Sequence, residues 1–88
     1  MTNVEDVLKR MPEYWLLMLM HSLCAVRPEV ARTAEELAEG VAMTIDHVRS
    51  TLRELCHGGY VTTVKDERGC PRYYVTGLGI IKVCSLFT

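Results

Sequence analysis

The chain has 88 residues, 49% of them hydrophobic, and a formal net charge of −1 at pH 7. This length predicts one domain, and this hydrophobic content excludes a disordered chain. The near-neutral total does not by itself indicate a nucleic-acid-binding protein, although residues 44–72 carry a net charge of +1 and residues 1–43 a net charge of −3.

We find no secretory leader or membrane span in the sequence. The apolar run at residues 14–20 lacks a basic segment directly before it and a small-residue cleavage site after it. It is also far shorter than the ~20 residues that cross a bilayer. We therefore expect a cytoplasmic protein with no membrane partner.

The N-terminal third has the pattern of helix. Asn3 is a candidate N-cap, and apolar residues recur at helical spacing over residues 4–11. Pro12 either kinks one long helix or opens a second helix as its first residue, and both alternatives stay open. Residues 13–26 are apolar nearly all round the helix, and Arg27-Pro28 is expected to end it.

Two capped helices are predicted next. Thr33 and Glu36 form a capping box that opens a short helix, and Gly40 suits the turn at its end. Thr44 then caps a third helix, which the glycine pair at residues 58–59 stops.

The third helix is expected to have one apolar and one polar face. Its apolar stripe consists of Ile45, Val48, Leu52, Leu55 and Cys56. At about 100° per residue, the opposite face consists of Asp46, His47, Ser50, Arg53, Glu54 and His57. Arg49 and Thr51 fall on the flanks.

A β-hairpin and a last helix complete the chain. Residues 60–65 are rich in β-branched and aromatic types, residues 66–69 form a turn cluster, and residues 72–75 return with Pro71 at the strand start. Thr76 caps a final helix that is apolar over most of its circumference.

A short capped helix, a tight turn and a second capped helix form a helix-turn-helix, and the hairpin takes the place of a wing. Residues 37–61 (LAEGVAMTIDHVRSTLRELCHGGYV) and 74–79 (YVTGLG) resemble winged-helix transcriptional regulators of the MarR, PadR and ArsR type. The resemblance covers roughly residues 14–87, and the size is nearest to small archaeal and archaeal-virus members.

The resemblance implies an α+β, mostly α fold. We expect a single winged helix-turn-helix domain over residues 1–88, with the helix-turn-helix at about 33–57, the wing at about 60–75 and the C-terminal helix at about 76–87.

Double-stranded DNA is the expected partner. A helix fits the B-form major groove with its N-terminal side chains near base edges, and the resemblance implies that wing cations meet phosphates or the minor groove. The predicted DNA-binding residues are Thr44, His47, Arg49, Ser50, Arg53, Lys65, Arg68 and Arg72.

The chain is also expected to pair with itself. A domain this small buries only about 60% of the surface its unfolded chain exposes. Its first and last helices are apolar nearly all round, which predicts that each is buried on two sides. In winged-helix regulators the first and last helices commonly form the dimer. The predicted interface residues are Trp15, Leu16, Leu19, Leu23, Ile80, Val83, Cys84 and Phe87.

The four cysteines are interpreted as small hydrophobes on apolar stripes, except Cys70 near the wing turn, which is expected to be exposed. No Cys-x-x-Cys pair encodes a zinc site, although His21 and Cys24 lie three residues apart on one predicted helix. Disulfides stay open, with Cys84 a candidate for pairing across a dimer axis. We expect no metal and no other cofactor.

The sequence predicts no enzyme, because it contains no nucleophile–base–acid set, phosphate-binding glycine loop or His-Glu-x-x-His motif. The favoured function is a homodimeric transcriptional regulator that binds specific double-stranded DNA. Two alternatives stay open. The acids on the third helix and wing favour a protein-interaction module of a transcription assembly, and the cysteines allow a metal- or thiol-responsive repressor.

Overall fold

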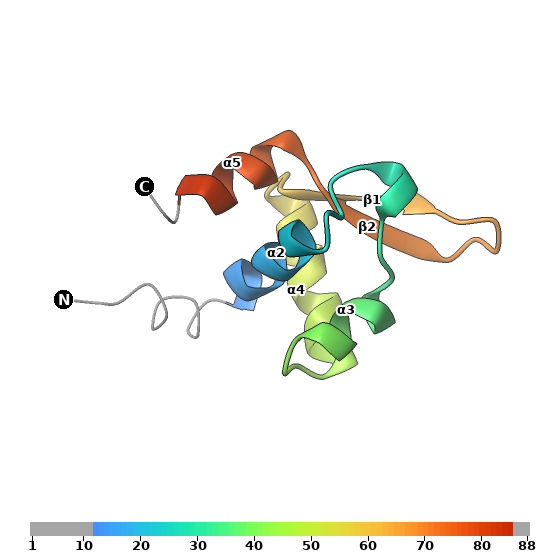
Figure 1. Ribbon diagram of the computed structural model, residues 1–88. Helices are drawn as coiled ribbons and strands as arrows, with labels where there is room; N and C mark the ends of the chain where they lie inside the picture. The colour runs from blue at the N-terminus through green and yellow to red at the C-terminus, as the bar shows by residue number, and fades with distance from the viewer. Residues whose placement is uncertain (1–11, 86–88) are drawn as a thin grey trace.

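The structure is a computed structural model that describes residues 12–85. The described part is an α+β domain, mostly helical, with a two-stranded antiparallel sheet (Figure 1). Its elements in order are α2 (Pro12–Ser22), a 3-10 helix η1 (Pro28–Val30), α3 (Ala34–Gly40), α4 (Ile45–His57), β1 (Val61–Lys65), β2 (Pro71–Val75) and α5 (Gly77–Ser85). The predicted cap at Asn3 and the choice between the two roles of Pro12 rest on residues outside this range.

The predicted caps of α3 and α4 are confirmed. Thr33 Oγ1 accepts from the Glu36 backbone N–H at 3.1 Å, and Glu36 Oε1 accepts from the Thr33 N–H at 3.4 Å, which completes the capping box. Thr44 Oγ1 accepts from the His47 N–H at 3.2 Å. Each cap satisfies N–H groups that the first turn of a helix leaves without partners, so α3 and α4 begin where the sequence predicts.

The predicted end of α2 is wrong. The helix stops at Ser22, four residues before the expected Arg27-Pro28 boundary. Cys24 takes a left-handed backbone conformation with φ of 60°, and the Ala25 N–H donates to the Met20 carbonyl at 2.9 Å. This is the hydrogen-bond pattern of a Schellman C-cap, which normally uses glycine. Ala25 is fully buried and its carbonyl accepts from the Val75 N–H at 2.7 Å, so burial of Ala25 and pairing with β2 favour the early stop.

The predicted hairpin is present. Val61 pairs with Val75 and Lys65 with Pro71, and Gly69 has the positive φ of 82° that the turn requires. One feature was not predicted. Arg32 and Tyr73 exchange two backbone hydrogen bonds, at 2.9 and 2.7 Å, which attach the segment before α3 to β2.

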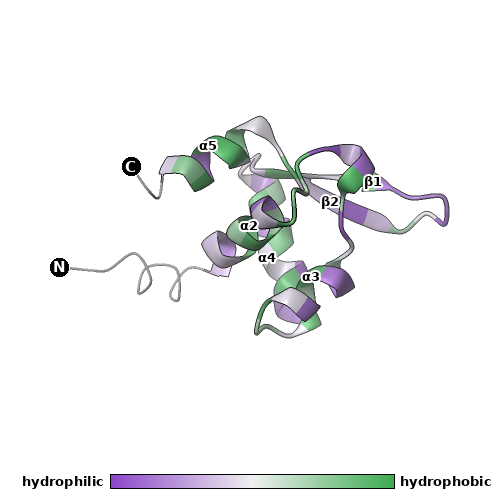
Figure 2. Ribbon diagram, viewed as in Figure 1, coloured by the Kyte–Doolittle hydropathy of each residue, from purple (hydrophilic) through white to green (hydrophobic). Residues whose placement is uncertain are grey.

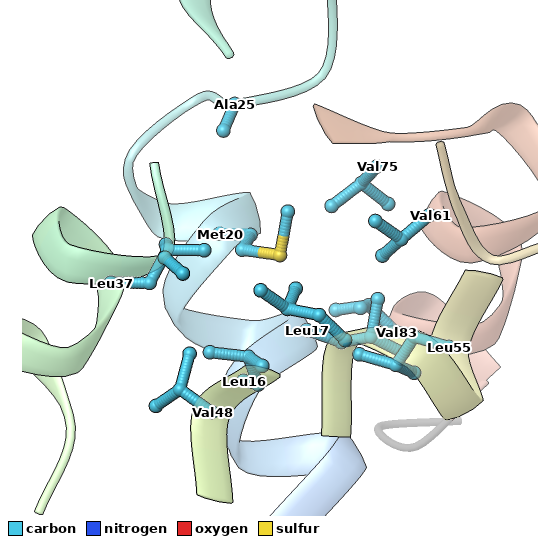
Figure 3. Close-up of a cluster of buried hydrophobic side chains, with 12 residues drawn as sticks. Leu16, Leu17, Met20, Ala25, Leu37, Val48, Leu55, Val61, Val75 and Val83 are labelled. Carbon is cyan, nitrogen blue, oxygen red and sulfur yellow. The ribbon is translucent and has the colours of Figure 1, made fainter. Parts of the chain in front are cut away.

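A single cluster of buried side chains joins the described elements (Figure 3). Leu16 from α2 points toward Val48 from α4, Leu17 points toward Val83, and Val61 and Val75 join the cluster from the hairpin. The other buried members are Met20, Ala25, Ala34, Leu37, Leu52 and Leu55. The core occupies the helical body, and the tip of the hairpin projects away from it with largely polar residues (Figures 1 and 2).

The start of α5 is fixed against the end of α4. Thr76 Oγ1 accepts from the Gly79 N–H at 3.1 Å and donates to the Gly59 carbonyl at 2.6 Å, which confirms the predicted cap. Gly79 lies so close to the Tyr60 carbonyl that a side chain there would overlap it. Across residues 12–85, every helix is too short or too polar to reach through a lipid bilayer.

Candidate nucleic-acid interface

The outward face of α4 is polar and open to solvent, as predicted. All five predicted contact residues at this helix are exposed, namely Thr44, His47, Arg49, Ser50 and Arg53. The opposite face is buried through Val48, Leu52 and Leu55. Because the buried face fixes the rotation of the helix, its polar side chains project away from the core together.

Arg49 is attached to α3 by an ion pair. Its Nη2 lies 2.6 Å from Glu35 Oε1, and both side chains are more than half exposed. The pKa of Glu35 is lowered, first by its own backbone N–H and then by Arg49, against the opposing effect of burial. The pair holds the short helix to the long one and neutralises one acid beside the exposed face, at the cost of occupying one predicted DNA-binding cation.

The tip of the hairpin presents Lys65 and Arg68. Both side chains are exposed, and neither has an ion-pair partner within the described part of the chain. Asp66 organises the turn between them, since its Oδ1 accepts from the Arg68 and Cys70 N–H groups, both at 2.9 Å. These bonds, that of Cys70 first, lower the pKa of Asp66. The tip is therefore an ordered turn that carries two free cations.

The predicted DNA-binding residue Arg72 has partners within its own chain. This side chain is only 36% exposed, and its guanidinium bonds inward. Nε lies 3.2 Å from Asp66 Oδ2, and Nη1 lies 3.2 Å from the Ala31 carbonyl and 3.3 Å from Glu36 Oε1. Val75 and Tyr73 share the core-facing side of β2, so Arg72 lies on the other side of the strand and reaches its partners through its long side chain. Arg72 is a structural cation of the domain.

The charges that stay exposed are balanced. Arg53, Lys65 and Arg68 are the cations of α4 and the hairpin without an ion pair inside residues 12–85, and they are accompanied by the exposed acids Asp46, Glu54 and Glu67. A surface with this composition attracts phosphate only locally, through individual side chains rather than a broad positive field.

Two of the predicted dimer residues are wrong. Leu16 is completely buried and Val83 is 4% exposed, so both pack into the core of their own chain and have no surface to offer a partner. Leu19, Leu23 and Ile80 are half-buried, while Trp15 and Cys84 are exposed. Phe87 lies outside the described residues.

The sequence reasoning missed two exposed apolar residues of α5. Leu78 is 51% and Ile81 is 66% exposed. They lie three residues apart and therefore share one face, with Cys84 a further three residues on. The all-round apolar pattern predicts the helix, but it does not show which of the apolar residues face outward.

Trp15 does not join this apolar stripe of α5. It borders a hollow of about 410 Å³ together with Val41, Met43 and His47, at the turn between α3 and α4. The preceding residue, Tyr14, contacts α5 instead, with Lys82 Nζ 5.4 Å from the centre of its ring. The single tryptophan is therefore beside the start of α4.

The cysteines are more exposed than predicted. Cys24 and Cys84 are exposed rather than buried on apolar stripes, and Cys70 is exposed as predicted. Cys56 is half-buried, and this burial raises the pKa of its thiol. All four are free thiols, and nowhere in residues 12–85 do three potential metal-ligating side chains gather. The shared helix face expected for His21 and Cys24 is lost because α2 ends between them.

No protein-family model, curated protein or solved structure matches this chain.

Proposed function

We propose that the chain is a winged helix-turn-helix domain that binds double-stranded DNA through α4 and the hairpin tip. The observation that carries this proposal is the outward face of α4, where Thr44, His47, Ser50 and Arg53 are all exposed while the opposite face is locked in the core. The order of short helix, turn, long helix and hairpin supports it.

In this proposal α4 lies in the major groove with its N-terminal end toward the bases. Thr44, His47 and Ser50 occupy this end and supply hydroxyl and ring groups suited to base or phosphate contacts. Arg53 carries a guanidinium that suits the two acceptors of guanine. Lys65 and Arg68, at the hairpin tip, meet phosphates or the adjacent minor groove.

The domain acts as a homodimer in this proposal. Few unpaired cations on one copy give weak affinity, and two copies on one duplex double the phosphate contacts. The exposed stripe of Leu78 and Ile81 on α5 is the apolar surface that pairing covers. A twofold dimer of this kind reads half-sites about 10 base pairs apart from centre to centre.

Fluorescence anisotropy with a labelled random-sequence duplex tests the proposal. We expect binding whose affinity falls steeply as salt rises from about 50 to 200 mM, because cations displace counterions from the phosphates. Arg53→Ala should weaken binding roughly 10-fold. Lys9→Ala removes the same charge at a residue to which the proposal gives no DNA contact, and should have little effect. Absence of binding at about 50 mM salt would refute the proposal.

A protein-docking module is the second candidate, and the balance of exposed charges favours it. Asp46, Glu54 and Glu67 repel phosphate but complement basic patches on a protein. Charge reversal separates the two functions. Glu54→Lys should strengthen duplex binding if the partner is DNA, and should leave the duplex unbound if the face serves a protein.

A further inference from the structure

A continuous set of polar contacts connects α3 to the tip of the hairpin. It starts at the capping box, where Glu36 Oε1 accepts from Thr33. The same Glu36 oxygen lies 3.3 Å from Arg72 Nη1, and Arg72 Nε lies 3.2 Å from Asp66. Asp66 in turn holds the Arg68 N–H at 2.9 Å. Four residues thus relate the helix that packs on α4 to a free cation of the tip.

The tip has little apolar packing to hold it in place. A hollow of about 690 Å³ lies beside it, and Glu29, Lys65, Arg68 and Arg72 are among the residues that line it. Its apolar lining residues are Pro28, Ala31 and Val64, and Val64 is the register partner of Arg72. The polar contacts of Arg72 are therefore well placed to control the direction of the distal hairpin.

Arginine is suited to this place because its planar group donates in several fixed directions. Arg72 reaches acceptors from three segments: Asp66 in the turn, the Ala31 carbonyl before α3, and Glu36 in α3. A lysine would offer one point charge and no such fork. Three acceptors around one half-buried guanidinium fix an orientation more firmly than a single exposed ion pair does.

We propose that Arg72 is a positioning residue, which through Glu36 and Asp66 sets the hairpin tip relative to α4 so that Lys65 and Arg68 reach the same ligand as Arg53. The expected effect of Arg72 on ligand binding rests on the proposed DNA binding. Its expected effect on the position of the hairpin tip does not. Arg72 is assigned no direct contact with DNA.

Two neighbouring glutamates of α3 provide a test in which the predicted effects have opposite signs. Glu35→Gln and Glu36→Gln each remove one negative charge from the first turn of α3. Glu35→Gln releases Arg49 and should strengthen duplex binding about 3-fold. Glu36→Gln keeps the capping box, since glutamine can make the same bond, but removes the charge that pairs with Arg72 and, at 3.6 Å, with Arg32. It should weaken binding roughly 3- to 10-fold.

The opposite result overturns the inference. If Arg72 contacts DNA directly, Glu36→Gln frees it and strengthens binding, as Glu35→Gln does. Arg72→Lys also loses the fork toward Asp66 and Ala31, so under the positioning role it should bind at least as weakly as Glu36→Gln. The double variant should be no weaker than Arg72→Lys alone, because Glu36→Gln then removes a partner that the fork no longer reaches. If the losses of affinity in the two single variants add up in the double variant, Arg72 and Glu36 do not act through one contact.

Nuclear magnetic resonance relaxation of backbone amides separates this inference from the proposed function. Residues 64–70 should become more mobile in Glu36→Gln and Arg72→Lys, with residues 45–57 unchanged and Glu35→Gln equal to the wild type. If the wild type binds no duplex, the proposed function fails while this measurement still decides the role of Arg72. Equal mobility in all variants overturns it.

Discussion

Helices α4 and α5 both pack one face into the same core, but they expose opposite chemistry. The inner face of α4 is buried through Leu52 and Leu55, and that of α5 through Gly79 and Val83. Outside, α4 presents hydroxyl, imidazole and charged side chains, whereas α5 presents Leu78 and Ile81. Figure 2 shows α5 as one of the more apolar elements of the described chain.

The contrast indicates what each outer face can bind. A polar face loses little by remaining in water and gains from charged or hydrogen-bonding partners, so it suits phosphate and base edges. An apolar face gains mainly by leaving water, at roughly 25 cal/mol per Å² of apolar surface buried, so it suits another protein surface. The two helices divide recognition and assembly between them in our proposal.

The largest expected effect distinguishes the two faces of α4. Leu52 is completely buried and Arg53 beside it is exposed. Leu52→Ala should lower the free energy of unfolding by about 2–5 kcal/mol, because it leaves a cavity in the core. Arg53→Ala should change it by less than about 0.5 kcal/mol. Urea denaturation of both variants measures this difference, and similar losses would contradict the assigned faces.

The inner face of α5 is tested by two glycines. A Cβ at Gly79 would overlap the Tyr60 carbonyl, whereas a Cβ at Gly77 meets nothing within 4 Å. Gly79→Ala should therefore destabilise the fold by about 1–3 kcal/mol. Gly77→Ala should be neutral or stabilise it by up to about 1 kcal/mol, because alanine restricts the unfolded chain. Thermal unfolding distinguishes them, and a harmless Gly79→Ala would show that α5 packs elsewhere.

The outer face of α5 is tested by the state of association. Ile81→Ser should weaken self-association roughly 10-fold, because it removes the most exposed large apolar side chain from the proposed interface. Glu54→Ser, on the outer face of α4, should leave association unchanged. Sedimentation velocity over a range of concentrations gives both results. A monomeric wild type would remove the proposed dimer, and an unaffected Ile81→Ser would place the interface elsewhere.

The smallest effect concerns one thiol on each helix. Cys56 on α4 is half-buried with a raised pKa, so less of it is thiolate near pH 8. Cys84 on α5 is exposed. We expect Cys84, with Cys24 and Cys70, to react quickly with a disulfide reagent, and Cys56 to react slowly with a rate that rises further as pH increases. Mass spectrometry at early times identifies the unmodified site.

Much of the local structure was predictable because its signals lie within a few residues. Thr33 and Thr44 cap helices through the side chain of one residue and the backbone three residues on, and Gly69 supplies a turn conformation by itself. The outward face of α4 was predictable because its apolar residues mark one side. Its exposed candidates Thr44, His47, Ser50 and Arg53 lie where the sequence places them.

Other features depend on residues far apart in the chain. Arg72 is paired with Glu36, 36 positions away, and bonds the Ala31 carbonyl, 41 positions away. No local sequence pattern therefore distinguishes it from the arginines that stay free at the surface. The early end of α2 depends on Ala25 meeting Val75 across the fold. Leu16 and Val83 were assigned to a partner because a helix apolar all round does not reveal which side its own core uses.

The sequence by itself determined the element types, their caps and the polar side of α4, because these follow from short-range hydrogen bonding and from helical periodicity. Only the tertiary structure decided which apolar residues face outward on α5 and which arginines remain free for a ligand. Both depend on the packing of distant segments, since burial and ion pairing are set by neighbours in space rather than by neighbours along the chain.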